Sequence, residues 1–121
     1  MTGTFSAACV QLRSSDDMAE NIRDASALIR EAAAKGAHYV QTPENTCLMA
    51  PDGGAKFELT FAEADDPALP AFRALAAELG IWLHIGSLAI KVAPGKVATR
   101  ACVIDPKGAI YEAEYNLADQ V

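Results

Sequence analysis

Cysteine and histidine are scarce in this sequence, and acidic side chains outnumber basic ones. The three cysteines, Cys9, Cys47 and Cys102, are odd in number and form no CxxC pair, so they predict neither a disulfide framework nor a zinc site. Only two histidines are present, His38 and His84, and we expect no metal centre and no cofactor. The net charge of −6 disfavours nucleic acid as a partner, because its phosphates would be repelled.

Long apolar runs are also missing. No stretch approaches the ~20 apolar residues that span a bilayer, so we expect no contact with a membrane. The first five residues lack the basic and apolar regions of a signal peptide, which predicts a cytoplasmic protein. Hydrophobic residues make up 51% of the 121 residues, so residues 1–121 are expected to form one folded domain with a buried core.

Two segments have the pattern of amphipathic helices. The first covers residues 18–35, with apolar residues at spacings of three and four, capping oxygens before it at residues 14–17, and Gly36 after it. The second covers residues 67–79 and ends at Gly80. These helices alternate with extended segments, so the order along the chain predicts an α/β fold.

Five segments have the pattern of strands. The last two are joined to their predecessors by turns, which predicts antiparallel neighbours and therefore a mixed sheet with helices on one face. The run at residues 4–12 is apolar enough for a buried strand, with Cys9 in the core. His84 is interpreted as a packed, hydrogen-bonded core residue, with a ligand as the alternative. The predicted strands are residues 4–12, 39–42, 81–90, 98–105 and 109–115.

The segment between the second strand and the second helix is expected to be irregular. Pro51-Asp52-Gly53-Gly54 is a strong turn signal. Residues 57–61 alternate apolar and polar side chains, and either a short extended piece or a helical turn fits them.

Glu44 follows the predicted strand at residues 39–42. Pro43 stops that strand because it has no N–H to donate, and Glu44 then lies at the carboxyl end of the strand, where ligands and catalytic groups collect in α/β sheets. The alternative is an ordinary solvated loop glutamate. If Glu44 belongs to a site, we expect much of its side chain to be hidden from solvent.

Several motifs occur in an order that resembles the N-terminal part of the nitrilase superfamily, the carbon–nitrogen hydrolases. They cover nearly the whole chain. The motifs are Ala7-Ala8-Cys9-Val10-Gln11-Leu12, Asn21-Ile22, Gly36-Ala37-His38-Tyr39-Val40-Gln41-Thr42-Pro43-Glu44, Gly80-Ile81, Gly86-Ser87, and Val103-Ile104-Asp105-Pro106-Lys107-Gly108-Ala109-Ile110 followed by Tyr115.

This resemblance implies an α/β/β/α sandwich, of which the chain forms half, and a Glu-Lys-Cys triad that hydrolyses amides or nitriles. Glu44 matches the general base. Leu117 stands where the lysine is expected, and no residue matches the nucleophilic cysteine. Cys47 is interpreted as a pocket or packing residue, with nucleophile as the alternative. The chain is therefore expected to be an N-terminal fragment that is inactive alone, from a natural truncation, a frameshift or an engineered end.

A second class of function remains open, a non-catalytic small α/β domain for binding or assembly. In either class the first three strands, which are linked by helices, are apolar enough to require burial on both faces. We therefore expect the chain to form a homo-oligomer or to associate with a partner chain. An assay with simple amides and nitriles, together with an accurate intact mass that establishes whether more chain exists, separates the two classes.

Overall fold

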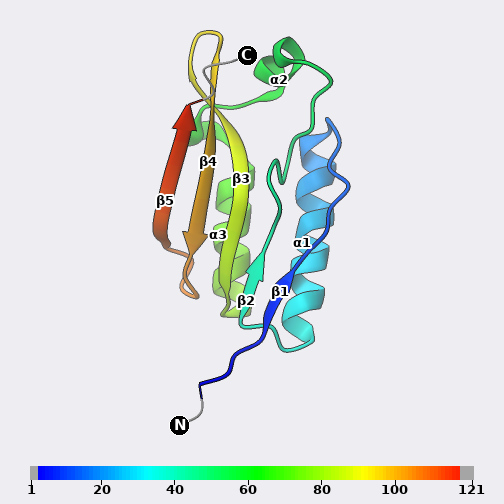
Figure 1. Cartoon of the computed structure of the whole chain (residues 1–121), viewed down its shortest axis with the longest axis vertical. Coiled ribbons are helices and arrows are strands. Elements are labelled where there is room, and N and C mark those ends of the chain that lie inside the picture. The colour runs from blue at the N-terminus through cyan, green and yellow to red at the C-terminus, as the bar shows by residue number, and fades with distance from the viewer. Residues whose placement is uncertain (1–2, 118–121) are drawn as a thin grey trace.

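Five strands form one mixed sheet in the computed structural model, which describes residues 3–117 (Figure 1). The strand order is β1-β2-β3-β4-β5, with β1, β2 and β3 parallel and β3, β4 and β5 antiparallel in turn. The elements are β1 (Ala7–Cys9), α1 (Met18–Ala34), β2 (Tyr39–Gln41), α2 (Gly53–Leu59), the 3-10 helix η1 (Glu63–Asp65), α3 (Ala68–Leu79), β3 (Trp82–Ala93), β4 (Lys96–Ile104) and β5 (Ile110–Leu117). The predicted α/β mixed sheet is confirmed.

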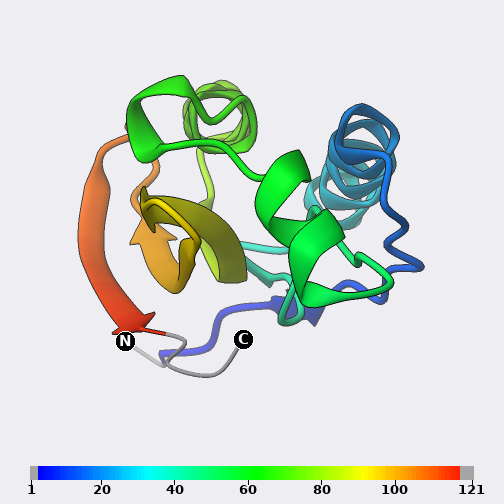
Figure 2. The same cartoon turned by 90° about the horizontal axis from the view of Figure 1, so that it is seen from above.

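Helices α1 and α3 lie side by side on one face of the sheet (Figure 2). Both were predicted to within one residue at each end, because their end signals are local. The side chain of Asp17 caps α1 by accepting a hydrogen bond from the Glu20 amide at 3.1 Å. Gly80 ends α3 in the left-handed conformation, with a φ of 65°.

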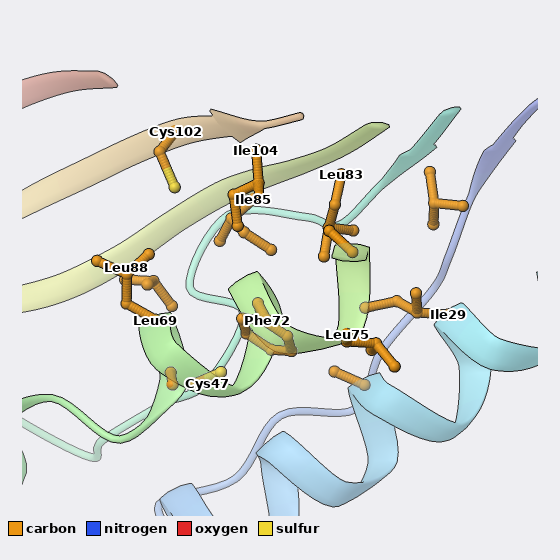
Figure 3. Close-up of a cluster of buried hydrophobic side chains, with 14 of the residues drawn as sticks. Ile29, Cys47, Leu69, Phe72, Leu75, Leu83, Ile85, Leu88, Cys102 and Ile104 are labelled. Carbon is orange, nitrogen blue, oxygen red and sulfur yellow. The ribbon is translucent and has the colours of Figure 1, made fainter. Parts of the chain in front are cut away.

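The hydrophobic core fills the space between these helices and the sheet (Figure 3). Phe72 of α3 is its largest fully buried side chain, and the same buried cluster includes Leu83 and Ile85 of β3 and Ile29 of α1. Burial of a large apolar side chain contributes about 1.5–3 kcal/mol, so this layer stabilises the sheet from one side.

Strand β1 differs from the expected buried strand. It covers three residues, lies at the edge of the sheet, and exposes Ala7 and Cys9 while Ala8 packs partly against the core. Side chains alternate between the two faces of a strand, and in the described chain no helix covers the second face. The prediction that Cys9 lies in the core was wrong for this reason.

The segment expected to be irregular contains a helix. Helix α2 begins at Gly53, and the Asp52 side chain caps it by accepting a hydrogen bond from the Ala55 amide at 2.8 Å. The Asp-Gly-Gly signal therefore starts a helical turn. Of residues 57–61, the first three end this helix, and the Phe61 carbonyl then accepts a hydrogen bond from the Lys91 amide at 2.8 Å.

The carboxyl ends of β1, β2 and β3 meet at one edge of the sheet, since these strands are parallel. The chain leaves β2 at this edge, passes through residues 42–50, and reaches α2 at the same end of the molecule (Figure 1). This edge positions the candidate site.

Candidate active site

Glu44 lies in a turn just beyond the carboxyl end of β2, as the sequence predicts. Its side chain is exposed, so the expectation that it would be hidden from solvent is wrong for the described chain. The chain that follows β2 continues beside β3 (Figure 1), and hydrogen bonds from Asn45 and Thr46 to Ser87 hold the turn against that strand. Glu44 therefore has a defined place in the fold, and its side chain is open to solvent in the described chain.

The turn that carries Glu44 is braced by its own threonines. The Thr46 hydroxyl donates a hydrogen bond to the Pro43 carbonyl at 2.6 Å, which closes the turn across Glu44. The hydroxyls of Thr42 and Thr46 lie 2.8 Å apart and share a hydrogen bond. Both threonines are buried, so two polar side chains without charge hold the backbone on either side of an exposed carboxylate.

Strand β3 holds the same turn through a second set of hydrogen bonds. The Asn45 amide donates to the Ser87 hydroxyl at 2.8 Å, and the Thr46 amide donates to the Ser87 carbonyl at 3.0 Å. The Gly86 amide donates to the Thr42 hydroxyl at 3.1 Å. Gly86 has no side chain to obstruct this approach, since a Cβ atom there would meet the backbone of Thr42 and Pro43.

Asn21 of α1 ties two loops together behind the turn. It is buried, and its amide nitrogen donates to the carbonyls of Ser15 and Cys47, both at 2.7 Å. Its side-chain oxygen accepts from the Ser15 amide at 2.9 Å. Ser15 follows β1 and Cys47 follows Glu44, so Asn21 fixes both loops at the carboxyl edge of the sheet.

Asn21, Thr42, Thr46 and Ser87 were not predicted as site residues. For Asn21 a signal was present, because it is a polar residue four positions before Ala25, on the apolar stripe of the first helix. Such a residue needs internal hydrogen bonds when the stripe is buried. Ser87 belongs to the Gly86-Ser87 motif of the resemblance, but its residue type alone does not indicate a hydrogen bond to the Glu44 turn.

Cys47 lies in the hydrophobic core, close to Glu44 in sequence but 2% exposed (Figure 3). Burial, and to a smaller extent the nearby carboxylate of Asp66, raises the pKa of its thiol to about 12. A thiol with this pKa is almost entirely protonated at neutral pH, so it is a poor nucleophile. The structure favours the packing interpretation.

His84 lies on the uncovered face of the sheet. Its Nδ1 atom and the Tyr39 hydroxyl are 2.7 Å apart, so it is hydrogen-bonded as predicted, but it is half-buried on the face opposite the core. It lines a hollow of about 330 Å³ that does not include Glu44. The hollow is also lined by Ala101, Cys102, Val103, Glu112, Ala113 and Glu114.

Two further observations concern residues 3–117. No group of three His, Cys, Asp or Glu side chains among them is placed to hold a metal ion. None of the helices in this range is long and apolar enough to cross a membrane. Leu117, at the position expected for lysine, is the last residue of β5 and pairs with Ala98 of β4.

Comparison with known proteins finds a consistent set of relatives. The chain is 32% identical over 107 residues to omega-amidase NIT2 of Mus musculus and, equally, to that of Bos taurus. Each match covers 88% of this chain and 38% of the relative, so the chain spans well under half of their length.

Solved structures with the same fold include the NitFhit protein of C. elegans and an amidase from Nesterenkonia sp. The NitFhit match has a TM-score of 0.81 at 24% identity and covers 92% of this chain and 27% of that chain. The amidase match has a TM-score of 0.77 at 23% identity and covers 93% of this chain and 43% of the amidase chain. The family model for carbon-nitrogen hydrolases matches residues 6–118. This chain belongs to the carbon–nitrogen hydrolase family.

Proposed function

We propose that this chain supplies Glu44 as the general base of an enzyme that hydrolyses the C–N bond of an amide or a nitrile. The observation that carries the proposal is the placement of Glu44 on a rigid turn at the carboxyl edge of a parallel sheet. Catalytic groups are expected at that edge, and they need a fixed backbone. Membership of the carbon–nitrogen hydrolase family supports this role.

The chemistry assigned to Glu44 is proton transfer. The carboxylate takes the proton of a thiol, the thiolate attacks the amide carbon, and the returned proton leaves with the amine as the C–N bond breaks. Glu44 then takes a proton from a water molecule that attacks the thioester carbon, the C–S bond breaks to release the carboxylic acid, and the proton returns to the thiolate. A cation beside the tetrahedral intermediate stabilises the charge on its oxygen.

The described residues supply only the base of this set. Cys47 is buried with a raised pKa, and position 117 is leucine, which has no charge and no donor. We propose that the thiolate and the cation come from polypeptide other than residues 3–117, and that the 121-residue chain alone has no turnover. The three free cysteines fit a reducing compartment, and we propose a cytoplasmic location.

The uncovered face of the sheet supports association with a further polypeptide. Tyr39, Trp82 and His84 are half-buried rings on that face, and Tyr111 is exposed beside Trp82 in an edge-to-face contact with centroids 5.3 Å apart. Sheets in two-layer folds bury such faces. A homo-oligomer or a complex with a partner chain would cover it.

Two activity assays test the proposal. The 121-residue chain, given simple amides and nitriles, should show no turnover, and thiol-dependent turnover that Cys47→Ala abolishes would contradict this. In a form of the protein that hydrolyses an amide, Glu44→Gln should lower amide turnover by a factor of about 10² to 10⁴. Glu58→Gln, at another exposed glutamate, is the matched control and should leave turnover unchanged. Full activity in Glu44→Gln would show that Glu44 is an ordinary loop residue.

A further inference from the structure

Strand β3 contains a β-bulge next to the Glu44 turn. Its pairing with β4 runs through Ile85↔Cys102 and resumes at Leu88↔Arg100, so Gly86 and Ser87 together face the single residue Ala101. The burial pattern changes phase at the same place, because Ser87 and Leu88 are both buried where alternation would expose one of them. Bulges redirect side chains and are frequent beside active sites.

The redirected side chain is that of Ser87, which is 2% exposed. Its hydroxyl accepts the hydrogen bond from the Asn45 amide, and its carbonyl accepts the one from the Thr46 amide. One residue of β3 thus holds both residues that follow Glu44. The sequence distance of 42 residues between Asn45 and Ser87 makes this a tertiary constraint on the turn.

Asn45 has a left-handed backbone, with a φ of 54°, and no other non-glycine residue in the described part of the chain has a positive φ. This conformation is unfavourable for most residues, although asparagine tolerates it better than most. The Asn45 N–H belongs to the peptide bond that joins Glu44 to Asn45. Its hydrogen bond to Ser87 therefore sets the orientation of the peptide plane next to the Glu44 Cα atom.

We infer that Ser87 is a positioning residue, which directs the Glu44 side chain by holding Asn45 in the left-handed conformation. Gly86 makes this possible, because the backbones of the bulge and the turn come together only where a side chain is absent. The role of Glu44 as a base rests on the proposed function. The conformational link between Ser87 and Asn45 does not depend on the proposed function, and a separate experiment tests it.

Amide hydrogen exchange by NMR on the 121-residue chain tests the link. Ser87→Ala removes the hydroxyl and should lower the protection of the Asn45 amide by about tenfold or more, while the amides of β2 and the first half of β3 keep theirs. Ser87→Thr retains a hydroxyl and should restore most of the protection. Ser14→Ala is the matched control, because it also removes one hydroxyl that contacts this turn: the Ser14 hydroxyl donates to the Thr46 carbonyl at 2.8 Å. This variant should leave the protection of the Asn45 amide unchanged.

Three results would overturn the inference. They are unchanged Asn45 protection in Ser87→Ala, an equal loss of protection throughout β2 and β3, or the same loss at Asn45 in Ser14→Ala. In a form of the protein that hydrolyses an amide, Ser87→Ala should lower kcat about tenfold with little change in KM, and Ser87→Thr should recover it. Normal turnover in Glu44→Gln would remove the proposed function, yet a Ser87-dependent Asn45 amide would still support the positioning role.

Discussion

Replacing Gly86 with alanine should destabilise the chain and disturb the Glu44 turn. A Cβ atom at position 86 would lie 2.5 Å from both the carbonyl carbon and the carbonyl oxygen of Pro43, and also against the carbonyl oxygen of Thr42. These are backbone atoms, and the Thr42 amide is held by the His84 carbonyl at 2.9 Å, so they cannot rotate away as a side chain would. The two segments must therefore separate.

The size of the effect follows from two opposing contributions. Overpacking of this kind costs about 1–3 kcal/mol, and the absence of a flexible neighbour places this site at the upper end. Alanine also restricts the unfolded chain relative to glycine, which returns about 0.4–1 kcal/mol. The expected net loss in the free energy of unfolding is about 2 kcal/mol, or roughly 8 °C in Tm for a chain of this size.

Urea unfolding of the Gly86→Ala variant measures this loss. The midpoint should fall while the m-value stays constant, and amide chemical shifts should move most at residues 42–46. Gly3→Ala is the matched control, because a Cβ atom at Gly3 has no neighbour within 4 Å. If Gly86→Ala unfolds within about 0.5 kcal/mol of the wild type, the close approach of β3 to the turn cannot constrain Glu44, and the reasoning from it fails.

Two further predictions concern buried groups. In the folded chain at pH 8, a thiol reagent should modify the exposed Cys9 and leave Cys47 and Cys102 unmodified until unfolding, because burial raises the pKa of both buried thiols. Equal rates at all three, measured by peptide mass, would contradict this. The Asp66 carboxylate accepts a hydrogen bond from the Leu69 amide at 2.9 Å, and burial raises the pKa of this carboxyl group. The stability that Asp66 contributes is therefore present below its pKa in the unfolded chain and is lost as the pH rises through its pKa in the folded chain. Asp66→Asn keeps an acceptor for the Leu69 amide and removes the charge, so the urea midpoint of the variant should exceed that of the wild type by more at pH 7 than at pH 4. The same difference at both pH values would count against a desolvated carboxylate.

The long helices could be predicted because their determinants lie within a few residues of each other. Asp17 caps α1, and Gly36 follows it with a φ of 98°, as the capping residues and the glycine in the sequence indicate. The turn at Asp52-Gly53-Gly54 could not be resolved in the same way. An Asp followed by two glycines suits both a turn and the first turn of a short helix, and the choice depends on how the segment docks at the sheet edge.

The candidate site was predictable in part. Pro43 ends the ladder in the sequence and in the structure, so the place of Glu44 at the carboxyl edge follows from local chemistry. The bulge at Gly86-Ser87 could be predicted only in part. A glycine inside a strand pattern is typical of a bulge or a close backbone approach, but it does not show which segment approaches. The hydrogen bonds that brace the Glu44 turn therefore join segments whose partnership exists only in the folded chain.

Burial was the property that the sequence predicted least well, at Cys9 and at Glu44, and for the same reason. Alternation shows which residues share a face of a strand, but it does not show what covers that face. Cys9 shares the uncovered face with His84 and is exposed, while Glu44 follows β2 at the carboxyl edge and is exposed as well. A carboxylate becomes an effective base for a thiol when water is excluded around it. Under the proposed function, a polypeptide that covered this edge would complete the site, because the described chain already fixes the backbone on both sides of Glu44.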